Sequence, residues 1–350
     1  MKSLLQYLTE QLVVEGGAAG HMLHPYELPF IFSGDDLVRW FTELEDKLRQ
    51  NITSTFVKLD GVNCAIRVRG GEEFVLDRLT KDPMDIVGMS VQDIMKRYGG
   101  HEYGYDRHAS AVVNAFNECF SAIKPELKKL GLLDNSNIMF NIEYIDKDRN
   151  IISTGKHTIA IHGLLMIEQT KTGARRSYEV RGDQGALDKI AQKMTKNLKD
   201  IEVITQEVAF MDGHVNIKRI LQTPMGVNFG DRKETKPLRT WMDEYVLTER
   251  KNCSVKTLMG KRVNTQSLQV MRHIYSGGDI SEWFAPKDQD IVLKNYFLQI
   301  ATLMIGQEFL NNMNSRIGHL SKQEGVVIRD TELNKMDAPV KLTGYFVLHK

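Results

Sequence analysis

The chain has 350 residues, 42% of them apolar, and a formal net charge of +1. The length suits one large domain or two smaller ones, and the balanced charge excludes a globally basic protein, so that any surface for nucleic acid must be a local patch. The three cysteines, Cys64, Cys119 and Cys253, are far apart in the sequence, which excludes a disulfide framework or a zinc ribbon and favours a reducing compartment. No apolar run approaches the roughly 18 residues of a membrane span, so we expect a soluble intracellular protein with no membrane partner.

Residues 1–20 are expected to form a leader or flexible N-terminus. Leu4, Leu5 and Leu8 indicate a short amphipathic helix, and a Gly/Ala-rich hinge follows at 16–20. The segment also resembles the capsid-targeting leaders of T4-type tailed phages, which end at an apolar-x-Glu cleavage site. That resemblance implies cleavage after Glu10 or Glu15 and packaging in the virion.

Ser33 and Asp36 form a capping signature that predicts the start of a helix, with apolar residues at helical spacing up to Leu48. Alternating apolar residues then predict a meander of three strands with tight glycine turns, at 54–58, 63–69 and 73–78. Further strands are predicted at 138–145, 158–167, 201–211, 215–221, 324–329 and 339–348. Helices are predicted at 90–98, at 109–130 with a break near Pro125, at 184–198, and over most of 237–312 with breaks at Gly277-Gly278 and Pro286.

A lysine at the end of a predicted strand, Lys58, is followed by Leu59, Asp60 and Gly61, and then by Asn63. This arrangement can hold an amine beside a nucleotide phosphate, because glycine lets the backbone approach closely. A solvated hairpin turn is the alternative for the Lys-x-Asp-Gly motif taken alone.

Other motifs follow Lys58 in a fixed order. Arg78 lies twenty residues beyond it, and Glu143 lies inside the apolar strand Phe140–Ile145. Glu324 precedes Gly325 and a run of apolar residues, and Lys341 follows in the last predicted strand.

In this order the motifs resemble those of the covalent nucleotidyltransferase superfamily of ATP-dependent ligases and capping enzymes. Asn63 makes the chain similar to the ATP-dependent RNA ligases of tailed bacteriophages. The resemblance implies an α+β nucleotidyltransferase (ATP-grasp-like ligase) domain built of antiparallel sheets, with ATP and Mg²⁺ as cofactors. In the implied reaction Lys58 becomes adenylylated, AMP passes to a 5′-phosphate, and a 3′-hydroxyl displaces AMP to seal the strand.

The resemblance also implies roles for individual residues. Lys58 would be the catalytic nucleophile, and Glu143 and Glu324 would hold the metal. The residues expected to bind the nucleotide are Asp60, Gly61, Asn63, Arg78, Glu143, His162, Glu324 and Lys341.

Structural alternatives exist for several of these residues. Arg78 could pair with Asp77 or Glu73, Glu143 could pair with a structural arginine, and Glu324 could be a strand-edge acid before a glycine turn. His162 stands where the family has an aromatic ring that stacks on adenine, and a structural histidine is its alternative.

The last motif departs from the family pattern of two lysines separated by one residue. Lys341 matches one lysine, and Thr343 occupies the position of the other. A threonine can hydrogen-bond a phosphate without neutralising its charge. This departure favours an alternative, a ligase-like protein that binds nucleotide or RNA ends without turnover. A capping-type transfer from the lysine to another acceptor is the other alternative.

We expect the nucleotidyltransferase core to occupy 21–224 and 321–350, with a helical insertion at 225–320 and no OB-fold. A basic stretch in the insertion, namely Lys251, Lys256, Lys261 and Arg262, could follow a polynucleotide backbone or form a solvated loop. The expected partners are RNA or DNA ends, and the expected location is the cytoplasm of an infected host cell. The sequence does not determine the oligomeric state.

Overall fold

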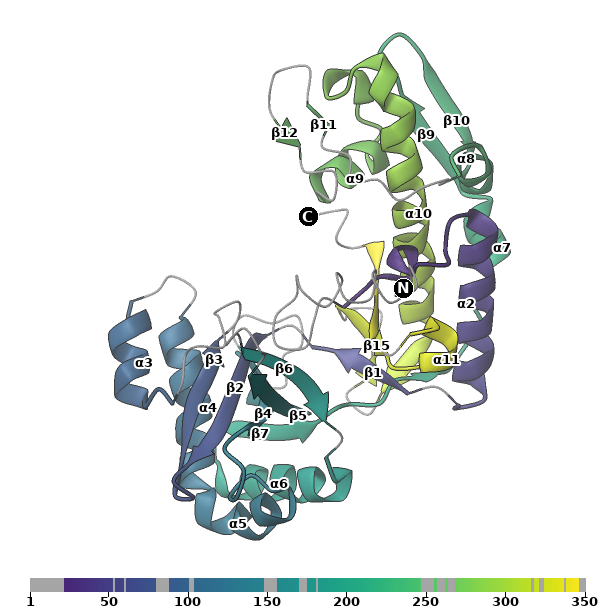
Figure 1. Cartoon of the computed structure of the whole chain (residues 1–350). Coiled ribbons are helices and arrows are strands. Elements are labelled where there is room, and N and C mark those ends of the chain that lie inside the picture. Colours follow the sequence, from purple (N-terminus) through teal and green to yellow (C-terminus); the bar gives the residue numbers. More distant parts are fainter. Residues whose placement is uncertain are drawn as a thin grey trace, which may run out of the picture. The chain divides into compact units, whose positions relative to one another are not determined.

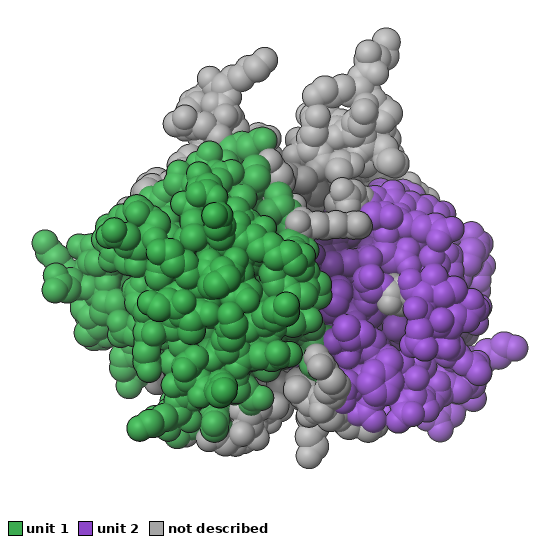
Figure 2. Space-filling model, turned by 90° about the horizontal axis from the view of Figure 1, so that it is seen from below, with its two compact units in different colours: residues 1–22, 59–207 green, residues 23–58, 208–350 purple. Residues whose placement is uncertain are grey.

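The computed structural model describes residues 22–52, 54–59, 61–79, 88–100, 104–147, 156–169, 175–180, 182–246, 255–256, 262–263, 268–315, 318–320, 324–336 and 338–345. The chain forms two compact units, which are coloured separately in Figure 2. Unit 1 contains residues 1–22 and 59–207, and unit 2 contains residues 23–58 and 208–350. Lys58 is therefore the last residue of one segment of unit 2, and Leu59 is the first residue of the next segment of unit 1.

Unit 1 is a mostly antiparallel sheet with helices on one face. Its strands follow the order β3-β2-β4-β5-β6, and β7 pairs in parallel with β5. The strands are β2 (Val62–Arg69), β3 (Glu73–Leu79), β4 (Ile138–Ile145), β5 (His157–Gln169), β6 (Arg175–Val180) and β7 (Ile201–Thr205). The helices are α3 (Val91–Tyr98), α4 (Tyr105–Glu118), α5 (Phe120–Lys129) and α6 (Gln184–Asn197).

One face of the unit-1 sheet is apolar and covered by helices. Cys64, Ile66 and Val68 of β2 alternate along one side of the strand and belong to a buried cluster that also includes residues of α4, α5 and α6. Figure 1 shows these three helices on the same side of the sheet. The other side of the sheet carries polar residues of β2, β3 and β4 together with a small buried apolar cluster of Ala65, Met139, Leu165 and Ile167.

Unit 2 is built around one long helix, α10 (Pro286–Asn311), which is buried on several sides. Helices α2 (Gly34–Arg49), α7 (Ile217–Leu221), α8 (Leu238–Glu244) and α9 (Leu268–Tyr275) pack against it, as do strands β15 and β16. Trp241 of α8 stacks on Phe297 of α10 at a centroid distance of 5.2 Å. No helix in the described part of the chain combines the length and apolar character that a bilayer span requires.

The strands described in unit 2 form four small sheets. A three-stranded sheet has the order β1-β15-β16, with β1 (Thr55–Lys58), β15 (Gly325–Ile328) and β16 (Val340–Thr343). A second has the order β14-β13-β8, and β9 with β10 and β11 with β12 form hairpins. These strands are β8 (Phe210–Met211), β9 (Pro224–Asn228), β10 (Lys233–Pro237), β11 (Val255–Lys256), β12 (Arg262–Val263), β13 (Met313–Ser315) and β14 (Gly318–His319). The short helices are η1 (Pro25–Glu27), η2 (Ile280–Glu282) and α11 (Thr331–Asn334).

The α+β class is confirmed, and so are most of the predicted elements. The predicted meander is wrong at its first strand, because β1 pairs with β15 while β2 pairs with β3 and β4 in the other unit. The predicted strand at 215–221 is the helix α7, and the predicted strand at 201–211 is two strands that belong to different units. Pro125 lies inside α5, and the break between helices falls at Cys119.

The predicted helical insertion at 225–320 contains hairpins as well as helices, beginning with β9 and β10. Its helices belong to the same compact unit as β1, β15 and β16. The predicted boundaries of the core and the insertion stay a prediction, because the two compact units divide the chain at other positions.

Candidate functional site

The β1-β15-β16 sheet has one buried apolar face and one polar face. The strand register places Lys58 beside Gly325 and Thr343, and Phe56 beside Val327 and Lys341. Because side chains alternate along a strand, Lys58, Lys341 and Thr343 share one face. The opposite face is buried and contains Thr55, Val57, Val326, Ile328, Val340 and Leu342. Residues separated by more than 260 positions in the sequence are thereby placed on one small surface.

The Lys58 amine forms an ion pair with Glu324, and both side chains are partly accessible, at 19% and 27%. Glu324 immediately precedes β15, whose first residue, Gly325, lies opposite Lys58. A Cβ atom on Gly325 would collide with the backbone oxygen of Leu342, so glycine is needed for β16 to pair closely at this point. The Glu-Gly dipeptide therefore places the acid at the strand end and lets the strands meet there.

Lys341 is half-buried on the same face of the sheet. Burial lowers the pKa of its amine, Lys58 shifts the pKa in the same direction, and Glu27 and Glu324 oppose the shift. Its backbone N–H donates to the carbonyl oxygen of Leu23 at 2.7 Å, which joins the segment before η1 to the edge of the sheet. Lys341 is thus acted on electrostatically by one lysine, Lys58, and by two glutamates, Glu27 and Glu324.

Thr343 occupies the position next to Lys341 on the same face and is 6% exposed. Helix α10 approaches closely behind it, because a Cβ atom on Gly306 would collide with the Thr343 carbonyl oxygen. Thr343, which replaces the second lysine of the family pattern, therefore lies on the same sheet face as Lys58 and Lys341.

A second polar group lies on the face of the unit-1 sheet opposite to helices α4, α5 and α6. Asn63 of β2 is paired with Glu143 of β4, and the Asn63 Nδ2 donates to Asn141 Oδ1 at 3.0 Å. Glu143 Oε1 accepts from the backbone N–H of Gly61 at 2.8 Å. A Cβ atom on Gly61 would collide with the Tyr144 carbonyl oxygen, so only glycine allows this turn to lie against β4.

His162 is brought to Glu143 by a bulge in β5. The register places Asn141 opposite Gly163 and Ile142 opposite Ile161, so that His162 is the extra residue. His162 Nε2 lies 2.7 Å from Glu143 Oε2. Each Glu143 oxygen therefore has a hydrogen-bond partner, and the imidazole is tied to the carboxylate.

Arg78 lies on β3 beside Ala65 of β2 and is 8% exposed. Burial lowers the pKa of its guanidinium group. The two acids that the sequence offers as partners both pair with other arginines: Asp77 with Arg67 at 2.9 Å, and Glu73 with Arg69 at 2.7 Å. Arg78 and Glu143 both act on the buried thiol of Cys64, whose pKa rises to about 12 mainly because of burial.

The predicted site residues therefore form two groups, one in each unit. Lys58, Glu324 and Lys341 lie together in unit 2, and Gly61, Asn63, Glu143 and His162 lie together in unit 1, where Arg78 also belongs. Asp60, Lys251 and Lys261 lie outside the described residues. The backbones of Lys256 and Arg262 pair across the β11–β12 hairpin.

Two participants were not predicted from the sequence. Asn141 holds Asn63, and strand alternation with Glu143 could have identified it, because residues two apart share a face. The segment Leu23–Glu27 supplies a backbone acceptor and a nearby acid to Lys341. No sequence pattern indicates that contact, because it joins positions more than 300 residues apart.

No protein-family model matches the sequence, and no curated protein matches it either. The functional argument therefore depends on the two groups of residues and their chemistry.

Proposed function

We propose that this protein is an ATP-dependent RNA ligase that works through a covalent lysyl-AMP intermediate at Lys58. The observation that carries the proposal is the shared sheet face of Lys58 and Lys341, with Glu324 in contact with the Lys58 amine. Lys58, Glu324 and Lys341 come from distant segments and meet on one small sheet. Their charges contribute little to the stability of the fold, because attraction between partly buried charges is offset by their lost hydration. This arrangement suits a site that handles phosphates.

In the proposed first step, the lone pair of the Lys58 amine attacks the α-phosphorus of ATP. A P–N bond forms, the bond to the bridging oxygen breaks, and pyrophosphate leaves with the electron pair. The amine must lose a proton before the attack, and the Glu324 carboxylate is positioned to accept it. Lys341 would hold the phosphate oxygens as charge moves to the leaving group.

The unit-1 group, taken by itself, offers hydrogen-bond partners that suit a ribose. Asn63 Oδ1 is buried and has no hydrogen-bond partner among the described residues, which is costly for an amide oxygen. A ribose hydroxyl could satisfy it, and Glu143, fixed by Gly61 and His162, would be a second acceptor. Arg78, on the neighbouring strand, would supply a cation for phosphate.

A divalent cation fits the donors that these residues offer. Mg²⁺ binds through one or two carboxylates and takes its remaining ligands from substrate phosphates and water. Glu324 is the more accessible carboxylate, whereas both oxygens of Glu143 are already hydrogen-bonded. When bound, the ion would neutralise phosphate charge.

The test is intact-protein mass spectrometry after incubation with ATP and Mg²⁺. We expect a gain of one AMP, and no gain in Lys58→Ala. Lys58→Arg is the matched control for the ion pair: it keeps a cation for Glu324, but arginine does not deprotonate and should form no adduct. Absence of an adduct in a folded wild-type sample that is not already adenylylated would overturn the proposal.

Acceptor assays separate the remaining possibilities. Sealing of nicked RNA, compared with nicked DNA and single-stranded RNA, identifies a ligase, and transfer of AMP or another nucleotide without sealing identifies a capping-type enzyme. Nucleotide binding without an adduct would favour the non-catalytic alternative, which the threonine at position 343 supports.

A further inference from the structure

Beyond Asn63, the same face of β2 carries the buried Ala65 and then two arginines. Arg67 and Arg69 follow at two-residue spacing, so both share the face of Asn63 and lie roughly 7 Å apart. Neither is used in the proposed adenylylation. The strand therefore leads from the Asn63–Glu143 group towards a basic surface.

Both arginines are held in place. Arg67 Nε pairs with the buried Asp77 at 2.9 Å, and its Nη1 lies 3.4 Å from the Ser136 carbonyl oxygen. Arg69 donates to Glu73 and, at 3.0 Å, to the carbonyl oxygen of Gly88. A guanidinium has five N–H donors, so each arginine keeps donors for a ligand.

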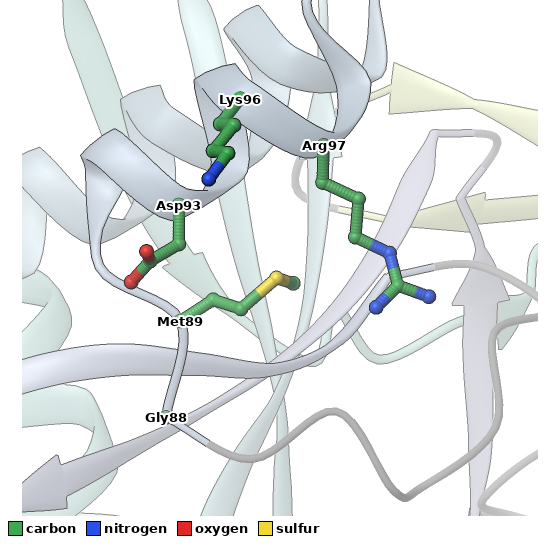
Figure 3. Close-up of a pocket in the computed structure, with 5 residues that line it drawn as sticks. All are labelled: Gly88, Met89, Asp93, Lys96 and Arg97. Carbon is green, nitrogen blue, oxygen red and sulfur yellow. The ribbon is translucent and has the colours of Figure 1, made fainter.

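The contact with Gly88 places these arginines at a hollow beside α3. The hollow is lined by Gly88, Met89, Asp93, Lys96 and Arg97. Figure 3 shows the Lys96 side chain running from α3 towards Asp93, and the Arg97 side chain on the other side of the Met89 side chain. Lys96 and Arg97 therefore line the hollow, and Arg67 and Arg69 lie beside its Gly88 edge.

The charges at this surface are unequally compensated. Asp77 and Glu73 pair with Arg67 and Arg69, and Asp93 is engaged by the Ser90 backbone and hydroxyl groups at the start of α3. Within the described part of the chain, neither Lys96 nor Arg97 forms an ion pair, and both are exposed. They are the charges that an anionic ligand would meet first.

We propose that Arg67, Arg69, Lys96 and Arg97 form a track for the phosphate backbone of the RNA, leading to the Asn63–Glu143 end of β2. The inference rests on the proposed function, which requires an RNA end. A row of cations along a strand and a helix suits successive phosphates, whereas a single phosphate would need the donors to converge on one point. Contacts of this kind position a strand without reading its sequence.

The test is binding of a fluorescent single-stranded RNA to the full chain across a range of salt concentrations. Lys96→Gln combined with Arg97→Gln removes two phosphate contacts. The plot of log affinity against log salt concentration should therefore become less steep by about 1.4, and the affinity at about 0.1 M salt should fall about 25-fold. The matched control, Lys196→Gln with Lys199→Gln, removes two exposed lysines at the end of α6, on the helical side of the sheet. It should leave the slope unchanged.

Equal losses of RNA affinity in both double variants would mean that only the overall charge of the protein matters. That result would overturn the track. An unchanged slope in the Lys96/Arg97 variant would overturn it as well. Each protein is also incubated with ATP and Mg²⁺, and the Lys58 adduct should form equally in all of them. If no protein forms the adduct but the Lys96/Arg97 variant alone loses RNA affinity, the proposed ligase is rejected and the track is retained. The two proposals can therefore fail separately.

Discussion

At the residue scale, Lys341 differs from an ordinary surface lysine in the pKa of its amine. Its pKa is lowered because the half-buried amine loses hydration, and the Lys58 charge adds to the effect. The unfolded chain therefore binds this proton more tightly than the folded protein. Lys341 consequently costs folding free energy at neutral pH, and that cost disappears as the pH rises from its lowered pKa towards the ordinary value of 10.5.

This shift predicts a pH effect on adenylylation. A phosphate contact needs the protonated amine, so adduct formation should fall on the alkaline side before an ordinary lysine would titrate. In Lys341→Arg the charge persists, and the alkaline fall should move to higher pH. The initial rate of adduct formation between about pH 7 and 10.5 measures this.

The control for that experiment is Lys335→Arg, at a lysine of unit 2 that packs over the Phe30 ring. It should leave the pH profile as it is. A profile that is the same in wild type and Lys341→Arg would show that Lys341 does not set the alkaline limb.

At the scale of elements, α2 shows how local chemistry fixes a helix end. Ser33 and Asp36 form a complete capping box: Ser33 Oγ accepts from the Asp36 N–H at 3.2 Å, and Asp36 Oδ2 accepts from the Ser33 N–H at 3.1 Å. The helix then buries Leu37, Trp40 and Phe41 among the other core residues of unit 2. This element was predictable because both the cap and the apolar period lie within sixteen residues.

Ser33→Ala should destabilise the protein by about 1 kcal/mol, because it leaves a backbone N–H at the helix start without its partner. Urea unfolding measures the loss, which should appear in the midpoint while the slope is unchanged. Ser33→Asp, which restores a capping oxygen, is the matched control. Equal stability of the alanine and wild-type proteins would show that water replaces the cap without cost.

Short elements were predicted less well, for an equally local reason. In 215–221, Val215, Ile217 and Leu221 share a strand period, but Ile217, Ile220 and Leu221 also share a helix face, and Asn216 caps the helix. Seven residues do not distinguish the two periods. The hairpin of β9 and β10 escaped prediction because Lys233–Pro237 is polar and contains no apolar alternation.

At the scale of the whole molecule, the two units differ in how the chain builds them. Residues 59–207 form nearly all of unit 1 as one continuous segment with its own buried cluster, whereas unit 2 needs segments from both ends of the sequence. A continuous segment with its own core can fold without the rest of the chain.

We therefore expect a fragment spanning 59–207 to unfold cooperatively on heating, as followed by circular dichroism. Phe116→Ala in this fragment should abolish or strongly lower the transition, because Phe116 is fully buried against Phe74 and Phe140. A fragment without a cooperative transition would show that unit 1 depends on unit 2. The same fragment lacks Lys58 and should form no AMP adduct.

The sequence by itself determined the helices and strands with long periodic patterns, the cap at Ser33, the α+β class and the residue types of the candidate site. These features depend on neighbours within about twenty residues. Only the tertiary structure decided that β1 leaves the predicted meander to pair with β15, that a bulge brings His162 to Glu143, and that Leu23 and Glu27 lie beside Lys341. Pairing between distant strands depends on which of their faces can be buried together. Because those faces belong to residues far apart in the sequence, no local pattern predicts the pairing.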